Sequence, residues 1–299
     1  MSISSIIRQI GRGVKGSSDL TRVQAKFFFS QILSKEISQL ELGAFCIAMR
    51  MKGETAEELA GFMDAISLHL KTLDTYQRRT IVLPSYNGSR KHMNLTPLLA
   101  LQLSKLGFLV IVQGVMRAPD RVSTYEIFQQ LNWPIHIHPC NEALLHDQLP
   151  IFVPLSTFCP ALQAVLDIRD QLGLRNSGHV LAKLMSPVSQ NTWQVANYTH
   201  PEYPKILEEY FAIFKSNVVL MRGHEGEPTS SLVRLPELTF LKQGQFAYKS
   251  SEYRFDDAEN VSGLSLEGHV EFVQRVIAGQ EKMPFAVLKQ AELLDEHCI

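Results

Sequence analysis

The chain has 299 residues, 45% of them hydrophobic and 20% charged, a composition that is typical of globular proteins and excludes a disordered or fibrous one. This length allows two packed domains, because single hydrophobic cores seldom grow beyond about 250 residues. The formal net charge is −1, so the chain has no overall positive charge for nucleic acid or membranes, and a bound polyanion would need cations gathered on one face.

Residues 1–75 predict a helical domain. The isoleucines between residues 3 and 10 follow helical spacing, and the glycine-rich residues 11–16 interrupt this apolar stretch too early for a secretory signal. Three capping boxes follow, each of which satisfies unpaired backbone N–H groups at the start of a helix. They pair Thr21 with Gln24, Ser38 with Glu41 and Thr55 with Glu58. We therefore expect four short helices.

From residue 80 the pattern changes to short apolar or β-branched runs that are separated by amphipathic segments of helical length. The predicted strands are Thr80–Leu83, Phe108–Val112, Ile151–Val153 and Val218–Met221. This alternation predicts a mostly parallel sheet with helices on both faces. All these runs are far shorter than the roughly 20 apolar residues that span a membrane.

The rest of the chain completes an α/β fold. Residues 160–184 are again predicted to be helical, and we expect them to pack against the N-terminal helices. Residues 242–263 have mixed charge and little periodicity, and two helices are expected near residues 266–278 and 284–294. The predicted domains are a small helical domain, residues 1–75 with about 160–186, and a larger α/β domain with a mostly parallel central sheet flanked by helices, residues 76–159 and 187–299.

The sequence predicts no metal, redox or catalytic site. The cysteines lack close CxxC spacing, so we expect reduced thiols in a cytoplasmic protein. These residues are Cys46, Cys140, Cys159 and Cys298. Core or surface roles are expected for His136, His138 and His179, whose spacing indicates neither metal binding nor catalysis.

A family resemblance begins in the helical region. The string Ala48-Met-Arg-Met-Lys-Gly-Glu-Thr55 resembles the N-terminal helical signature of glycosyltransferase family 3, which includes the anthranilate phosphoribosyltransferases. Leu181–Pro187 is similar to a later conserved stretch of that family, and Arg175 occupies the position of its anthranilate-contacting arginine. The resemblance implies a homodimer formed through the N-terminal helices.

The segment that would bind diphosphate departs from the family pattern. In the family, a Gly-Thr-Gly-Gly-Asp loop wraps diphosphate, because glycines let backbone amides approach the phosphates closely. Here the loop contains Pro84, Ser85, Tyr86, Asn87 and Gly88. Side chains replace three glycines, proline removes an N–H donor, and the aspartate position holds a glycine.

Three further family motifs are altered. The Lys-His-Gly-Asn-Arg motif falls on Val112–Met116, which removes both cationic phosphate contacts, and the serine-rich motif falls on Pro119–Glu126. The metal-binding Asp-Glu pair falls on Pro228-Thr229. Glu225 and Glu227 are near enough in sequence that a shifted register would restore one acidic metal ligand.

Taken together, these departures resemble the YbiB-type paralogues of anthranilate phosphoribosyltransferase. The motifs that carry this resemblance are Pro84–Lys91, Asn94–Ala100 and Arg175–His179. The resemblance implies that the fold and the dimer are kept and that nucleic-acid binding takes the place of catalysis.

Six cations are the predicted phosphate contacts. Arg90 and Lys91 lie where the altered loop would meet the next helix, so a helix N-terminus, free amides and two positive charges would form an anion site. A solvated, charged turn is the alternative. The other cations would extend a basic strip across the mouth of the sheet, unless they are scattered over the surface. The full set is Arg90, Lys91, Arg117, Arg121, Arg175 and Lys183.

Two aromatic side chains are candidates for stacking on unpaired bases. They are Tyr86 and His92, although a lone tyrosine in such a loop can instead pack against its own domain.

Three hypotheses for the function remain open. The first is a non-catalytic homodimer that binds DNA or RNA with little sequence preference and without a cofactor, since no helix-turn-helix, zinc or basic-zipper motif is present. The alternative is a pentosyltransferase of the anthranilate phosphoribosyltransferase type, in which Asn94, Thr96 and Arg175 serve a rearranged site for phosphoribosyl diphosphate and Mg²⁺. The third is a scaffold or regulatory protein that binds a small anion or a protein partner. No membrane partner is expected.

Overall fold

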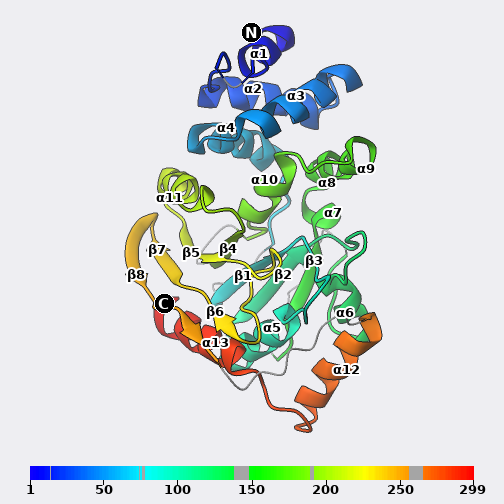
Figure 1. Cartoon of the computed structure of the whole chain (residues 1–299), viewed down its shortest axis with the longest axis vertical. Coiled ribbons are helices and arrows are strands. Elements are labelled where there is room, and N and C mark those ends of the chain that lie inside the picture. The colour runs from blue at the N-terminus through cyan, green and yellow to red at the C-terminus, as the bar shows by residue number, and fades with distance from the viewer. Residues whose placement is uncertain (14, 74, 76–77, 138–147, 189–191, 256–264) are drawn as a thin grey trace.

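The computed structural model describes residues 1–13, 15–73, 75, 78–137, 148–188, 192–255 and 265–299. A group of helices lies at the top of Figure 1, and a twisted sheet with its own helices lies below it. This arrangement confirms the predicted fold class.

The N-terminal region is helical, as predicted. Its helices are α1 (Ile3–Ile10), α2 (Arg22–Leu33), α3 (Gln39–Lys52), α4 (Ala56–Ile66) and the short 3₁₀ helix η1 (Ser67–His69). In α2, α3 and α4, the hydroxyl of the preceding residue accepts a hydrogen bond from the backbone three residues later, and the side chain there bonds back. Local sequence thus fixes these helix starts.

A second group of helices returns to the N-terminal helices. They are α7 (Leu155–Phe158), α8 (Pro160–Asp167), α9 (Arg169–Leu172) and α10 (Gly178–Leu184). α8 packs against α2, and α10 packs against α4, as expected for this part of the chain. The predicted helical stretch is divided into several short helices. Gly173, with φ +67°, ends α9 in the left-handed conformation that glycine readily adopts.

A seven-stranded sheet forms the lower part, with the order β3-β2-β1-β4-β5-β7-β8. The parallel strands are β1 (Thr80–Ser85), β2 (Leu109–Gly114), β3 (Ile151–Pro154), β4 (Thr192–Tyr198) and β5 (Asn217–Arg222). An antiparallel hairpin of β7 (Leu238–Lys242) and β8 (Gln245–Lys249) extends one edge. The short strands β6 (Arg234–Leu235) and β9 (Tyr253–Arg254) pair separately.

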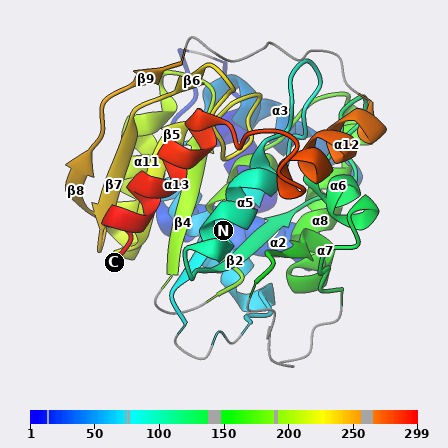
Figure 2. The same ribbon diagram turned by 90° about the horizontal axis from the view of Figure 1, so that it is seen from below.

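Helices cover both faces of the sheet. Figure 2 shows α5 (Thr96–Lys105) and α13 (Phe285–His297) over one face, with α6 (Thr124–Gln130) and α12 (Leu266–Ile277) on the same side. α11 (Tyr203–Phe214) packs with α4 and β5 on the other side. Side chains alternate between two cores, since Val110 and Val112 of β2 point to the first face and Ile111 to the second. The second core runs without interruption from Ile6 in α1 to Leu220 in β5.

Two predictions about the chain need correction. β4 was not predicted, because its buried Gln194 and Asn197 interrupt the apolar run. Residues 242–263 were expected to be irregular, yet residues 245–249 and 253–254 form β8 and β9. The four predicted strands themselves are all present.

The cysteines and the hydrophobic segments fit the expectations as far as they are described. Cys46, Cys159 and Cys298 are buried and free, while Cys140 lies outside the described residues. In the described ranges, no helix combines the length and the apolar character needed to cross a bilayer.

Candidate nucleic-acid interface

The candidate site lies where the parallel strands end and face the helical domain. The loops after β1, β2 and β5 meet at this edge, opposite α8–α10. β2 and β3 lie on one side of β1, while β4 and β5 lie on the other, so the strand order reverses between β1 and β4. In α/β sheets, ligands bind at the carboxyl ends of the strands beside such a reversal.

A glutamate of the protein fills the loop that the family uses for diphosphate. The Glu227 side chain is buried, and its carboxylate accepts hydrogen bonds from the backbone amides of Asn87 and Gly88, each at 2.8 Å. The hydroxyl of Ser85 donates to the same carboxylate, and that of Thr96 does so at 3.4 Å. The amides after β1 therefore do hold an anion, but it belongs to the protein.

A second glutamate occupies the next three amides of the loop. The Glu225 carboxylate accepts hydrogen bonds from the backbone N–H groups of Arg90 at 2.6 Å, Lys91 at 2.9 Å and His92 at 3.1 Å. The Arg121 guanidinium lies 3.4 Å from the same carboxylate. The prediction that these amides are free for a phosphate is therefore wrong.

The surroundings of Glu225 favour its charged form. Burial by itself would raise the pKa of this carboxyl, but hydrogen bonds from the amides of Arg90 and Lys91 lower it, and so do the nearby His224 and Arg121. The result is a pKa below the usual value, so Glu225 is ionised at neutral pH.

The turn that carries both glutamates is held in an unusual conformation. The amide of Glu227 donates to the His224 carbonyl at 2.9 Å, and φ is +51° at Glu225 and +87° at Gly226. A non-glycine residue in this left-handed region costs roughly 1–2 kcal/mol, which the hydrogen bonds of the carboxylate offset. A Cβ at Gly226 would collide with the side-chain amide of Asn87, which also donates to the Glu225 carbonyl at 3.0 Å.

The outermost predicted cations are exposed. Arg90, Lys91 and Arg117 reach solvent, and none of them forms a salt bridge with another described residue. The helix that follows the loop begins only at Thr96, so Arg90 and Lys91 do not lie at its N-terminus as predicted.

Two of the predicted cations brace the turn instead of facing solvent. The Arg121 guanidinium donates to the carbonyl of Gly88 at 3.1 Å, and the Lys183 ammonium donates to the Asn197 side-chain oxygen at 2.9 Å and to the Gly226 carbonyl at 2.8 Å. The polar side chain of Asn197 in β4 thus has a structural role. Lys183 is therefore a support of the turn, and its predicted role as a direct phosphate contact needs correction.

The positive charges at this edge repel one another. The pKa of Lys183 is lowered to about 8, first by burial and also by the nearby Arg175 and Arg121, whereas Glu227 acts in the opposite direction. Two arginines thus lie close enough to the buried Lys183 ammonium to act on it, although the chain as a whole is almost neutral.

Arg175 lies at the centre of this positive cluster. Burial lowers its pKa to about 10, and Arg169, Arg121 and Arg50 act in the same direction. Within the described part of the chain, its guanidinium forms no salt bridge. Sequence reasoning missed Arg50 and Arg169. Arg50 lies inside the family signature string and could have been noticed there, whereas no motif marks Arg169.

A cleft of about 650 Å³ opens between the loop after β2 and helices α8–α10. Arg117, Arg169 and His179 line it together with three acidic residues, Glu126, Asp167 and Asp170. The cleft therefore combines both charges, and its cations lie next to the Arg175 cluster, since Arg169 belongs to both.

The two predicted stacking residues differ in their surroundings. Tyr86 is only 5% exposed, and its hydroxyl donates to the Gln113 side chain at 2.5 Å, so stacking on a base is wrong for this residue and packing is right. His92 is partly exposed, and its ring lies 4.9 Å from the ring of His224. Stacking by His92 stays a prediction.

The polar side chains expected to bind a donor substrate, those of Asn94 and Thr96, form hydrogen bonds within the protein. The side-chain amide of Asn94 donates to the hydroxyl of Thr124 at 3.0 Å, and its oxygen accepts from the Thr96 amide at 3.1 Å. Asn94 and Thr96 are both fully buried. Neither side chain is available to a donor substrate.

A divalent cation fits poorly at this edge. His92, His224 and Glu225 bring three potential ligand atoms within 4.8 Å of one another, but each Glu225 oxygen already accepts two hydrogen bonds from nitrogen donors. Glu227 is equally engaged with the loop after β1. Both carboxylates point at N–H and O–H donors, so neither has an uncommitted oxygen to offer to a metal ion.

Of the other histidines singled out from the sequence, His136 and His179 are described by the structure. The pKa of His179 is lowered to about 3, first by burial and also by Arg175 and Arg169. Its ring lies 3.3 Å from the Asn176 side-chain oxygen, and His136 is only partly exposed. His138 lies outside the described residues.

Comparison with known proteins supports the family. Residues 4–67 match the helical bundle domain of the glycosyl transferase family. YbiB of Escherichia coli (strain K12) is 35% identical over 289 residues, which cover 95% of this chain and 90% of YbiB. Anthranilate phosphoribosyltransferase of Saccharopolyspora erythraea is 23% identical over 280 residues, or 91% of this chain and 78% of that enzyme.

Solved structures share the fold. Anthranilate phosphoribosyltransferase from Thermus thermophilus aligns with a TM-score of 0.75 at 21% identity, over 97% of this chain and 86% of the enzyme. The enzyme from Saccharomyces cerevisiae in complex with PRPP and Mg aligns with a TM-score of 0.73 at 15% identity, over 99% and 88% of the two chains. The chain therefore belongs to the YbiB-like proteins, which combine the glycosyl transferase family helical bundle with an anthranilate phosphoribosyltransferase-like fold.

Proposed function

We propose that the protein is a non-catalytic, cytoplasmic, nucleic-acid-binding homodimer with little sequence preference, and that DNA is its ligand. One observation carries the proposal: an almost neutral chain gathers mutually repelling cations at the ligand-binding edge of its sheet. These cations are Arg50, Arg121, Arg169, Arg175 and Lys183. Cations that gather at one edge favour a polyanion over a neutral ligand.

The arrangement suits an extended phosphodiester better than a compact diphosphate. The amides that would clasp a diphosphate are taken by Glu225 and Glu227, so the remaining binding groups are long cationic side chains. Arg90, Lys91 and Arg117 are exposed on the loops after β1 and β2, where phosphates spaced along a strand can contact them. Phosphate contacts position a nucleic acid without reading its bases, so little sequence preference is expected.

The transferase alternative has less support. Its donor site was to use Asn94 and Thr96, but both side chains are buried and hydrogen bonded within the protein.

The exposed cations test the proposal first. We expect Arg90→Ala/Lys91→Ala to weaken DNA binding by about three- to tenfold, and to reduce the slope of log affinity against log salt by about 2, since each lost phosphate contact removes about 0.9. Fluorescence anisotropy with a labelled duplex at several salt concentrations measures both quantities.

The matched control removes two exposed lysines from the opposite edge of the sheet. Lys105 ends α5 and Lys242 ends β7, so Lys105→Ala/Lys242→Ala changes the net charge equally and should leave DNA affinity within about twofold of wild type. Equal losses in the two variants, or a flat salt dependence in the wild type, would contradict the assigned interface.

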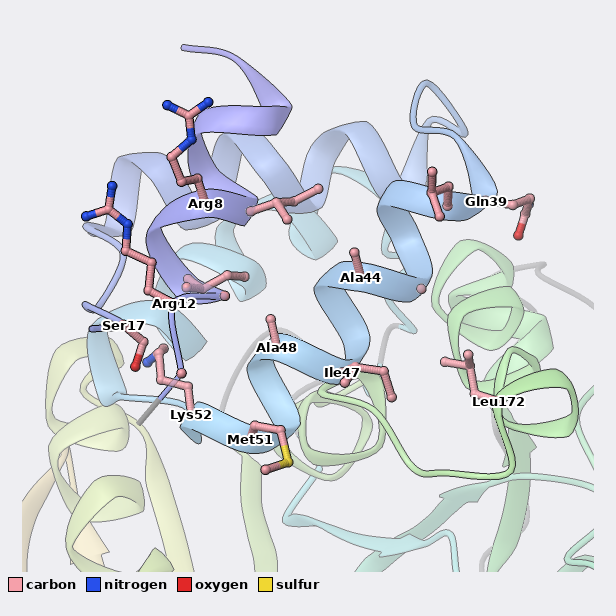
Figure 3. A pocket seen from close by; sticks show the side chains of 16 residues that line it. Arg8, Arg12, Ser17, Gln39, Ala44, Ile47, Ala48, Met51, Lys52 and Leu172 are labelled. Atoms are coloured by element: carbon pink, nitrogen blue, oxygen red, sulfur yellow. The ribbon is translucent and has the colours of Figure 1, made fainter. Parts of the chain in front are cut away.

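The homodimer is proposed from an apolar groove between α1 and α3. The groove has a volume of about 800 Å³, and Figure 3 shows Ala44, Ile47, Ala48 and Met51 of α3 along it. Leu40 and Met51 in its wall are 84% and 72% exposed. A second copy would cover these side chains, and the family resemblance assigns dimerisation to the same helices.

A charge in this groove should separate the subunits. We expect Leu40→Glu/Met51→Glu to elute as a monomer where the wild type has twice the mass of one chain, because a carboxylate in an apolar interface loses its hydration. Light scattering coupled to size-exclusion chromatography measures the mass. The control is Val23→Glu, since Val23 of α2 is 66% exposed but does not line the groove. A wild-type monomer, or a dimer that persists in the double variant, would refute this interface.

A further inference from the structure

The loop between β1 and α5 is folded around the turn 224–227 as a binding loop folds around a ligand. Five consecutive or near-consecutive backbone amides, those of Asn87, Gly88, Arg90, Lys91 and His92, donate to two carboxylates more than 130 residues away in sequence. Amides that converge on one point form a site for an anion of any origin.

We propose that the amides of residues 90–92, with the Arg121 guanidinium, form a latent site for phosphate-class anions that the Glu225 carboxylate keeps closed. Glu225 is thus a specificity-determining residue: it acts as an internal anion and excludes free diphosphate. The inference goes beyond nucleic-acid binding and does not depend on it.

Of the two glutamates, Glu225 is the one that a ligand could replace. Glu227 is 1% exposed and bonds two hydroxyls deep in the site, whereas the side chain of Glu225 is 13% exposed and lies beside exposed Arg90 and Lys91. An anion from solvent can therefore reach the position of the Glu225 carboxylate. It would meet three N–H donors and a guanidinium there, which is the donor set that phosphate oxygens prefer.

Glu225 has a backbone conformation that glutamate disfavours, which indicates that the contacts of its carboxylate outweigh the local conformational preference. Its φ of +51° is unfavourable for a side chain other than asparagine, aspartate or glycine. A glycine would suit this conformation and would remove the anion at the same time. Glu225→Gly is therefore a variant that empties the site while relieving backbone strain.

The experiment compares inorganic pyrophosphate binding by wild type and Glu225→Gly in calorimetric titrations without metal. We expect no binding by the wild type at millimolar pyrophosphate and an affinity at least about tenfold higher in the variant, since the donors lose their internal partner. Amide resonances of residues 90–92 should move in the variant and return toward their wild-type positions when pyrophosphate is added.

The control reproduces the backbone change elsewhere. Gln243, with φ +53°, precedes Gly244 in the β7–β8 turn as Glu225 precedes Gly226, so Gln243→Gly relieves similar strain and should gain no pyrophosphate binding. If Glu225→Gly fails to fold, Glu225→Asn takes its place, because asparagine tolerates this φ and its shorter side chain carries no charge. Equal binding by wild type and variant, or a folded variant with unmoved amides and no binding, would overturn the proposal.

Discussion

Replacing Glu58 by alanine should lower the free energy of unfolding by about 3–5 kcal/mol, because it breaks a buried ion pair and leaves Lys52 with only the largely exposed Asp19 as a partner. The Glu58 side chain is fully buried, and one carboxylate oxygen lies 2.7 Å from the Lys52 ammonium, whose side chain is only 7% exposed. The other oxygen accepts from the Leu20 amide at 2.8 Å, and the capping box of Thr55 depends on the same carboxylate. One substitution thus removes an ion pair, a helix cap and a tie between helices.

Chemical denaturation at equilibrium measures this loss, and the adjacent residue supplies the control. Glu57 lies in the same first turn of α4 but is exposed, so Glu57→Ala should change stability by no more than about 0.5 kcal/mol. If Glu58→Ala and Glu57→Ala unfold at the same denaturant concentration, the buried ion pair is not a main support of the helical domain.

The second large effect is expected from Arg169, which lines the cleft, and from Arg175 near it. Arg169→Ala/Arg175→Ala should weaken DNA binding by about ten- to a hundredfold, more than loss of the exposed Arg90 and Lys91. The reason is burial: Arg175 and Arg169 are only partly exposed, so solvent and salt screen their charges less. The salt slope should fall by about 2 in the same anisotropy measurement.

A conservative pair separates charge from shape in this prediction. Arg169→Lys/Arg175→Lys keeps both charges and should bind DNA within about threefold of wild type if phosphates are the ligands. Thermal unfolding of each variant excludes loss of fold as the cause. An alanine variant that is folded and binds DNA like the wild type would show that the cluster serves another ligand.

Local patterns predicted much of the fold. The capping boxes at Thr21, Ser38 and Thr55 act within four residues, so the sequence alone marks where α2, α3 and α4 begin. β4 was not predicted because two of its buried residues are polar. The Gln194 side chain donates to the Lys183 carbonyl, and the Asn197 side chain accepts from the Lys183 ammonium. A strand whose polar residues serve a tertiary contact has no periodic pattern of its own.

The site was predicted only in outline. The altered loop and the cations around it were found from the sequence, and the loops at the carboxyl edge bring Arg121, Lys183 and Arg175 close enough to influence one another. That Glu225 and Glu227 would fold onto this loop could not be predicted, because the partners are more than 130 residues apart. Sequence spacing carries no information about such a contact. The alignment with the family's metal-binding Asp-Glu pair instead suggested that Glu225 or Glu227 would bind a metal ion.

The uninterrupted core from Ile6 to Leu220 makes the two domains a single cooperative unit. Parting the two domains would expose apolar surface to water, which opposes hinge bending between them. An opening of the cleft through domain motion would therefore have to overcome this hydrophobic cost.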